Sequence, residues 1–208
     1  MKFDPRIHHR RSIRFKGFDY TQPGAYFVTL VSYQRECLFG EVLDGQVRLN
    51  DIGKIVDRCW RVISRHFPEV ELDIFVLMPN HLHGIIWISD RDDRGEASDD
   101  VEREISHHFA AAYSRSTSPP EVDASPQRPK GTQSGSLNAI VQNFKSVSTR
   151  KANRRLGSPG SKIWQRDYYE RVVRNERELN AIRRYIDNNP AQWESDRENP
   201  IFKGRSIG

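Results

Sequence analysis

The hydrophobic and polar residues of this chain follow two spacings, one typical of strands and one typical of helices. Runs of β-branched and aromatic residues with few charges predict strands, and apolar residues three and four apart predict helices. The expected strands are residues 25–33, the two arms of a hairpin at 37–50 turning at Asp44-Gly45, and residues 70–78, 81–89 and 163–173. The expected helices are residues 51–66, a helix that starts at Ser136, and residues 175–188. This order, with hairpin links, predicts an α+β sandwich around one mainly antiparallel sheet.

Residues 90–135 differ from the rest of the chain in composition. Between residues 90 and 130 there are ten acidic and six basic residues, a net charge of −4, so the remainder of the chain carries +9. A polar, Pro- and Ser-rich segment predicts a disordered or loosely ordered insert, in which 101–113 could form a short helix. The expected organisation is a basic N-terminal extension at 1–24, one domain at 25–195 interrupted by this insert, and a tail at 196–208.

The charge and cysteine content limit the classes of partner. A net charge of +5 and a pI near 9.3 favour a polyanionic partner. Cys37 and Cys59 form no Cys-x-x-Cys pair, which indicates a reducing compartment. No apolar run approaches the length of a membrane span or a signal peptide. We therefore expect a cytoplasmic protein without a membrane partner, associated with the nucleoid if it binds DNA.

The stretch VLMPNHLHGIIWI (76–88) breaks an apolar run with two histidines. Residues i and i+2 of a strand share a face, so His81 and His83 would project side by side and could form half of a metal site. An isolated His-x-His is more often a polar pair at a strand edge. Here the Pro-Asn break and the immediate return to apolar residues favour a functional site.

Two polar residues near the end of the last helix are candidates to complete this site. Tyr185 and Asn189 are four residues apart in RRYIDNNPAQW, so they share one helix face. An Asn carbonyl can ligate a metal, and a Tyr hydroxyl beside a metal can act as a nucleophile. The alternatives are packing for the tyrosine and a simple helix stop for the asparagine. Two imidazoles leave Zn²⁺ and Ni²⁺ open as well as harder ions.

Taken together, MPNHLHGIIWI, WQRDYYERVVRNERELNAIRRYIDNNPAQW and GAYFVTLVSYQRECLFGEV resemble the REP-associated tyrosine transposases, single-tyrosine transposases of the HUH superfamily. The resemblance covers roughly residues 11–89 and 136–195. It implies an RNA-recognition-like, or ferredoxin-like, fold. It also implies an enzyme that nicks and rejoins single-stranded or hairpin DNA through a 5′-phosphotyrosine.

The same resemblance assigns roles to individual residues. Tyr185 matches the attacking tyrosine, and His81, His83 and Asn189 match the ligands of Mg²⁺ or Mn²⁺, with no small-molecule cofactor. A monomer and a homodimer are both compatible with the family. No dedicated base for the phenol proton is evident. The alternatives are an inactive DNA-binding protein, an RNA-directed protein on the same fold, and a metal-dependent hydrolase of small phosphoesters.

Basic side chains in three parts of the chain are candidates for contacts with DNA phosphates. They are Arg10, Arg11, Arg14 and Lys16 near the N-terminus, Lys145, Arg150, Lys151, Arg154 and Arg155 in the second helix, and Arg166, Arg171, Arg174 and Arg184 further on. Tyr168 and Tyr169 are rival nucleophiles that we interpret as packing or base-stacking residues. Arg183, which also flanks Tyr185, could steady a phosphate or be an exposed helix charge.

Overall fold

The computed structural model describes residues 22–89 and 134–200. The N-terminal candidates for DNA contact, the short helix expected at 101–113 and nearly all of the acidic insert lie outside these ranges. Within them, no helix is both long and apolar enough to cross a membrane.

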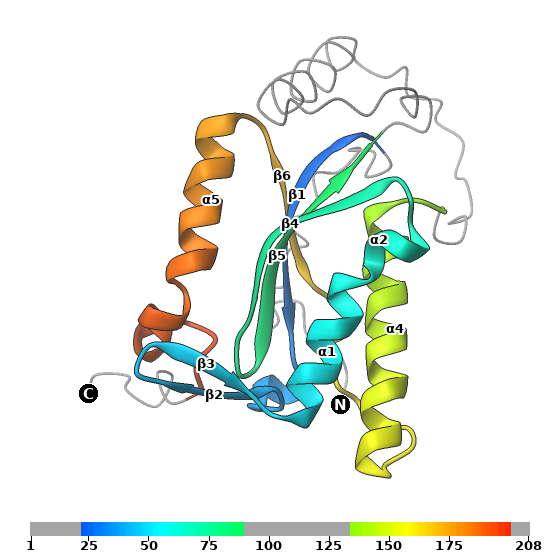
Figure 1. Cartoon of the computed structure of the whole chain (residues 1–208), viewed down its shortest axis with the longest axis vertical. Coiled ribbons are helices and arrows are strands. Elements are labelled where there is room, and N and C mark those ends of the chain that lie inside the picture. Colours follow the sequence, from blue (N-terminus) through cyan, green and yellow to red (C-terminus); the bar gives the residue numbers. More distant parts are fainter. Residues whose placement is uncertain (1–21, 90–133, 201–208) are drawn as a thin grey trace, which may run out of the picture.

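Four strands form one antiparallel sheet at the centre of the molecule (Figure 1). They are β1 (Gly24–Val31), β4 (Val70–Leu77), β5 (His81–Ile88) and β6 (Tyr169–Val173), in the order β4-β5-β1-β6. Every neighbouring pair is antiparallel. The strands are joined as two split βαβ units, which is the ferredoxin-like arrangement. The α+β class with a mainly antiparallel sheet is confirmed.

The helices cover the two faces of this sheet unequally (Figure 1). One face carries α1 (Asp51–Arg61), the short α2 (Ile63–His66) and α4 (Leu137–Leu156), and the other carries α5 (Glu176–Asn188). The caps follow the sequence: the side chains of Asn50, Ser136 and Asn175 each accept a hydrogen bond from the backbone N–H three residues on.

Each face of the sheet has its own apolar cluster. The larger joins the face of β1 and β5 that bears Leu82 and Ile86 to Trp60 of α1 and Phe144 of α4. The smaller joins Ile85 and Trp87 to the apolar stripe of α5, which is Leu179, Ile182 and Ile186. Strand β5 is therefore buried on both faces, which explains why its sequence is apolar throughout rather than alternating.

A two-stranded hairpin, β2 (Gly40–Leu43) and β3 (Gln46–Leu49), lies apart from the main sheet. Its turn residues Asp44 and Gly45 have φ of 52° and 70°, which is the left-handed pair that a two-residue hairpin turn requires. The hairpin packs beside η2 (Pro190–Ser195), the short helix that follows α5 (Figure 1). A second short helix, η1 (Tyr33–Arg35), follows β1.

Two expected elements are shorter than the pattern predicted. The helix expected at 51–66 is interrupted at Val62, whose φ and ψ of −104° and 8° separate α1 from α2. The strand expected at 163–173 begins only at Tyr169. Residues 163–165 still pair with residues 31–33, through an antiparallel bridge between Ser32 and Trp164 and the backbone hydrogen bonds beside it. The pairing breaks at residues 166–168, where Lys145 Nζ donates to the carbonyls of residues 165–167 at 3.0–3.2 Å.

Candidate metal and tyrosine site

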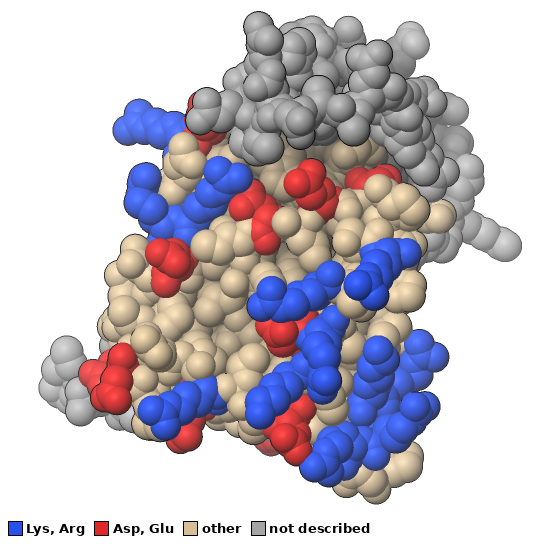
Figure 2. All heavy atoms as spheres, in the orientation of Figure 1, with Lys and Arg blue, Asp and Glu red and all other residues tan. Residues whose placement is uncertain are grey.

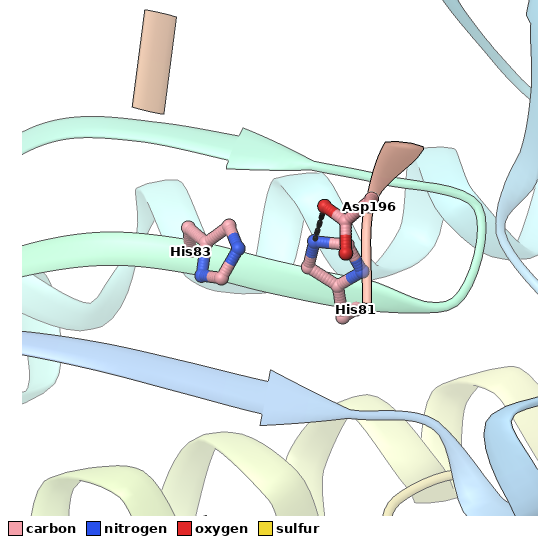
Figure 3. A group of neighbouring side chains, drawn as sticks. All are labelled: His81, His83 and Asp196. Carbon is pink, nitrogen blue, oxygen red and sulfur yellow. Dashed lines mark ion pairs between the residues drawn. The ribbon is translucent and has the colours of Figure 1, made fainter. Parts of the chain in front are cut away.

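His81 and His83 lie on β5 and point to the face that α5 covers (Figure 3). A tight turn at Pro79-Asn80 joins β4 to β5, so His81 and His83 lie at the closed end of the β4–β5 hairpin. Their ring centroids are 4.5 Å apart, and both side chains are buried. The i, i+2 spacing has therefore placed them side by side, as the strand geometry predicted.

Asn80 fixes the hydrogen positions of His81. Its Nδ2 donates to the carbonyls of Arg35 at 3.0 Å and Glu198 at 2.7 Å, which only the NH₂ group can do. The atom 2.9 Å from His81 Nδ1 is then the Asn80 Oδ1, a pure acceptor. His81 Nδ1 must carry the hydrogen, and the lone pair of Nε2 is left for another partner.

His83 is held between a strand neighbour and the helix. Its Nδ1 lies 2.8 Å from Thr29 Oγ1, directly across the strand pair, and its Nε2 lies 3.1 Å from the hydroxyl of Tyr185. Phe27 stacks on the ring with centroids 5.5 Å apart. A hydroxyl can donate or accept, so these contacts hold the ring without fixing which nitrogen is protonated.

Tyr185 and Asn189 share a face of α5, and both face the histidines. The Tyr185 ring meets Phe27 edge-on at 6.2 Å, its hydroxyl contacts His83, and 45% of the residue is exposed to solvent. Asn189 is buried and caps the C-terminal end of α5. The structure thus brings together all four residues that the sequence nominated for the metal site and the nucleophile.

Asp196 joins this group, although the sequence did not indicate it (Figure 3). Its Oδ2 lies 3.8 Å from His81 Nε2 and accepts a hydrogen bond from Asn189 Nδ2 at 3.2 Å. The ligand atoms of His81, His83 and Asp196 all lie within 4.8 Å of one another. Asp196 had been assigned to the tail at 196–208, outside the expected domain, and an acid after a helix stop carries no spacing signal.

The donor set fits a divalent metal ion. His81 Nε2 and Asn189 Oδ1 are buried, and neither meets a partner at hydrogen-bond geometry. Buried polar atoms are rarely left unpaired unless a water or an ion satisfies them. Two imidazole nitrogens, one amide oxygen and one carboxylate oxygen suit a first-row ion such as Mn²⁺, while the two oxygens also admit Mg²⁺.

The protonation states favour metal binding. Burial lowers the pKa of His81 to about 4, with Asp196 and Asn189 opposing the shift and Arg35 adding to it. Burial, with the neighbouring His81, holds the pKa of His83 well below its usual value. Burial and then Asp196 raise the pKa of Tyr185, and Asn189 partly offsets this. Near neutral pH both imidazoles are therefore neutral ligands, and the phenol keeps its proton.

The chain after α5 is tied down across this site. Glu198 is bound through its carbonyl to Asn80 and through its carboxylate to Arg35. The ring of Trp193 lies 6.0 Å from that of His81. Arg35 itself has φ of 62°, in the left-handed region that costs a non-glycine residue about 1 kcal/mol or more. These contacts hold Asp196 against the histidines.

The other candidates for DNA contact fall into three groups. Lys145 donates hydrogen bonds to the backbone carbonyls of residues 165–167, and burial lowers its pKa to about 8. Arg171 pairs with Glu178. The exposed candidates are Arg150, Lys151, Arg154 and Arg155 on α4, and Arg166, Arg174 and Arg184. Figure 2 shows Lys and Arg side chains gathered over α1 and the lower half of α4.

Tyr168 and Tyr169, the rival nucleophiles, lie away from the centre of the site. Both are partly buried, Tyr168 against the larger apolar cluster and Tyr169 against the smaller. The ammonium of Lys145 lies 5.3 Å from the centre of the Tyr168 ring. Tyr169 meets Phe27 edge-on at 6.1 Å.

Comparisons with known proteins give a relative of substantial identity and several remote solved structures. No protein-family model matches the chain. A solved REP-associated tyrosine transposase bound to a REP hairpin is similar over 84% of this chain and 71% of its own, at 16% identity and a TM-score of 0.49. A Deinococcus radiodurans protein proposed to be a transposase is similar over 84% and 97%, at 17% identity and a TM-score of 0.41. The first carries the family name that the sequence resemblance gave, and the second is described only as a transposase; at these values we transfer no activity from either.

The close relative is a Haemophilus influenzae protein described as uncharacterised. It is 39% identical over 195 residues, which cover 94% of this chain and 96% of the relative. Identity at that level over nearly the whole of both chains reflects common descent. The chain therefore belongs to the same protein family as this Haemophilus influenzae protein.

Proposed function

We propose that the protein is a metal-dependent single-strand DNA endonuclease and transposase that cleaves hairpin DNA through Tyr185. The observation that carries the proposal is the contact of the Tyr185 hydroxyl with His83 Nε2 at 3.1 Å, beside a second buried histidine and an orphaned amide oxygen. Of the tyrosines described, Tyr185 is the one in contact with the paired histidines. The sequence resemblance to REP-associated transposases supports the same reaction.

Tyr185 carries out the chemical step. Its Oη attacks the phosphorus of one phosphodiester, the bond to the 3′ oxygen breaks, and a 5′-phosphotyrosine and a free 3′-hydroxyl result. The phenol proton leaves to water and the departing 3′ oxygen takes a proton from water, because 45% of Tyr185 is exposed to solvent. The free 3′-hydroxyl can reverse the reaction on another end, so strand transfer needs no external energy source.

His81, His83, Asn189 and Asp196 would hold the divalent ion. When bound, the ion supplies electrophilic stabilisation of the charge that builds on the phosphate. His83 Nε2 has one lone pair, so it serves either the ion or the Tyr185 hydroxyl, and ion binding would leave the hydroxyl to the substrate. Asn80 and Thr29 hold the imidazoles in place from their Nδ1 sides.

The basic surface over α1 and α4 would bind the phosphate backbone of the hairpin. It consists of Lys54 and Arg58 on α1 with Lys151, Arg154 and Arg155 on α4. Arg58 and Lys151 both act on the buried Cys59 and oppose the rise of its pKa, which shows that the two helices bring their charges together. Arg155 also bonds Asp51 at 2.6 Å, so its charge is partly neutralised.

The test is cleavage of end-labelled DNA hairpins with single-stranded tails, taken from the sequence that flanks the gene. We expect nicking with Mn²⁺ or Mg²⁺, none with chelator and none with Tyr185→Phe. Tyr169→Phe is the matched control, because it removes a hydroxyl from another tyrosine that packs against Phe27. Cleavage that persists in Tyr185→Phe would contradict the proposal. Cleavage confined to RNA would favour the RNA-directed alternative.

A further inference from the structure

Strand β4 contains an irregularity directly beneath α5. Leu72 pairs with Ile86 and Phe75 pairs with Gly84, so two residues, Asp73 and Ile74, stand opposite the single residue Ile85. An extra residue in one strand bends it and turns a side chain to the opposite face. Here both residues reach the α5 side: Ile74 packs in the smaller cluster, and Asp73 meets the helix.

Asp73 is the centre of a polar contact between the sheet and α5. Its carboxylate accepts from Arg183 Nη2 at 2.6 Å and Nε at 3.1 Å, and from the indole N–H of Trp87 at 3.2 Å. The backbone N–H of Ile74 donates to it at 2.7 Å. Only 13% of the Asp73 side chain is exposed. Arg183 is therefore ion-paired with the sheet and is not a free helix charge.

The position of Arg183 on α5 gives this contact a consequence for the site. The stripe of Leu179, Ile182 and Ile186 faces the sheet. At about 100° per residue, Arg183 lies on one edge of that stripe and Tyr185 on the other. Arg183 binds β4, and Tyr185 contacts β5 and β1. Apolar side chains alone would allow α5 to roll, that is, to rotate about its own axis. The contacts of Arg183 and Tyr185 on opposite edges of the stripe fix this rotation.

We propose that Asp73 and Arg183, with Trp87, form a clamp that sets the roll of α5 and thereby holds Tyr185 against His83. They are positioning residues, not catalytic ones. Side chains reach about 5–6 Å from a helix axis, so a roll of about 20° moves the tyrosine hydroxyl by roughly 2 Å. That displacement is enough to break a 3.1 Å hydrogen bond and to lower a rate about 100-fold.

The test compares Asp73→Asn, Arg183→Gln and Arg183→Lys with Arg177→Gln, which removes an exposed charge elsewhere on α5. The first readout does not depend on DNA cleavage. Nuclear Overhauser effects between the Tyr185 ring and the rings of Phe27 and His83 are measured in the metal-free protein. We expect Asp73→Asn and Arg183→Gln to lose these contacts and to keep those between Trp60 and Phe144 in the larger cluster. Arg183→Lys should recover them in part, and Arg177→Gln should keep them all.

The second readout is hairpin cleavage, which rests on the proposed function. We expect kcat to fall about 10- to 100-fold in Asp73→Asn and Arg183→Gln, with KM changed less than about threefold. If the ring contacts are lost but wild type cleaves nothing, the clamp stands and the proposed function fails. If Asp73→Asn or Arg183→Gln keeps the ring contacts and wild-type kcat, the clamp is refuted. If Asp73→Asn does not fold, the ring contacts of Tyr185 in Arg183→Lys test the clamp instead.

Discussion

The two faces of the central sheet are built differently. The face under α1 and α4 is closed by large apolar side chains: Phe144 is in ring contact with both Trp60 and Trp164, and all three are almost completely buried. The face under α5 has a smaller apolar cluster, and beside it lie two histidines, a half-exposed tyrosine and two buried atoms without hydrogen-bond partners. One face provides most of the packing, and the other carries the polar groups that chemistry needs.

This division predicts that stability and activity respond to different residues. Strand β5 takes part in both, because its even-numbered residues face the large cluster and its odd-numbered residues face the site. Gly84, which directly follows His83 on the strand, shows how close the two faces are: a Cβ there would lie 2.5 Å from a ring carbon of Trp60. The packed face therefore holds the strand that presents the histidines.

The largest expected effect is on the packed face. Trp60→Ala removes a fully buried indole from the centre of the larger cluster. We expect the free energy of unfolding to fall by about 3–5 kcal/mol, the usual range for a buried large aromatic side chain. Urea unfolding measures this free energy. Tyr185→Phe is the contrast on the other face, and we expect it to lie within about 1 kcal/mol of wild type because 45% of the residue is exposed. Equal losses in the two variants would remove the distinction between the faces.

The pattern of the sequence was sufficient for most of the fold, because strands and helices leave local signals. The β-branched and aromatic run of β1, the apolar run of β5, the Asp44-Gly45 turn and the stripe Leu179-Ile182-Ile186 each depend on neighbouring residues only. The strand expected from residue 163 is interrupted at residues 166–168, where Lys145, a residue of another element, binds the backbone carbonyls. A contact of that kind has no local signal.

The site was predictable only in part, for the same reason. His81, His83, Tyr185 and Asn189 occur in two short motifs with fixed spacing, so the resemblance named all four of these residues, which the structure brings close together. Asp196 lies beyond the last recognisable helix, and Asp73 and Arg183 are 110 residues apart in the chain. Asn80 was interpreted only as a break in a strand, although its side chain joins His81, Arg35 and Glu198.

The next largest effect should appear at Asn80, on the side of the site. Asn80→Ala removes the acceptor that fixes His81 and the donor that holds Glu198. Groups that orient metal-binding histidines typically contribute 10- to 100-fold to affinity, so we expect Mn²⁺ affinity to fall by about that factor. Titration calorimetry measures it, with Asn143→Ala on the exposed side of α4 as the control. Unchanged affinity in folded Asn80→Ala would mean that His81 needs no such support.

A smaller effect concerns the pH dependence of the clamp. Burial alone would raise the pKa of Asp73, but hydrogen bonds from Arg183, the Ile74 N–H and Trp87 outweigh it and lower the pKa below 3.8. A group with a lowered folded-state pKa stabilises the protein above its unfolded pKa and loses that contribution as pH falls. Near pH 7 the free energy of unfolding of wild type should exceed that of Asp73→Asn by about 1–2 kcal/mol. This figure allows for the partial exposure of Arg183.

Below about pH 3.8 the difference between these two proteins should shrink. Urea unfolding at intervals from pH 7 down to pH 3 records it, and Arg177→Gln should run parallel to wild type throughout. A difference that stays constant down to pH 3 would show that the charge of Asp73 contributes nothing to stability.

The smallest effect should come from the basic surface. Lys151→Gln and Arg154→Gln each remove one exposed charge from α4. We expect each to weaken hairpin binding a few-fold and to reduce the slope of log affinity against log salt by about 1, the mark of a lost phosphate contact. Fluorescence anisotropy with a labelled hairpin measures both, with Arg177→Gln on α5 as the matched loss of charge. Equal slopes in all three variants would place the DNA elsewhere.

The account rests most directly on a covalent bond between Tyr185 and DNA. The measurement is mass spectrometry of the protein after incubation with a DNA-only hairpin and Mn²⁺, followed by digestion to peptides. The account predicts a nucleotide adduct on the α5 peptide at Tyr185, absent with chelator and absent in Tyr185→Phe. An adduct on Tyr168 or Tyr169, or cleavage without any protein–DNA bond, would contradict it.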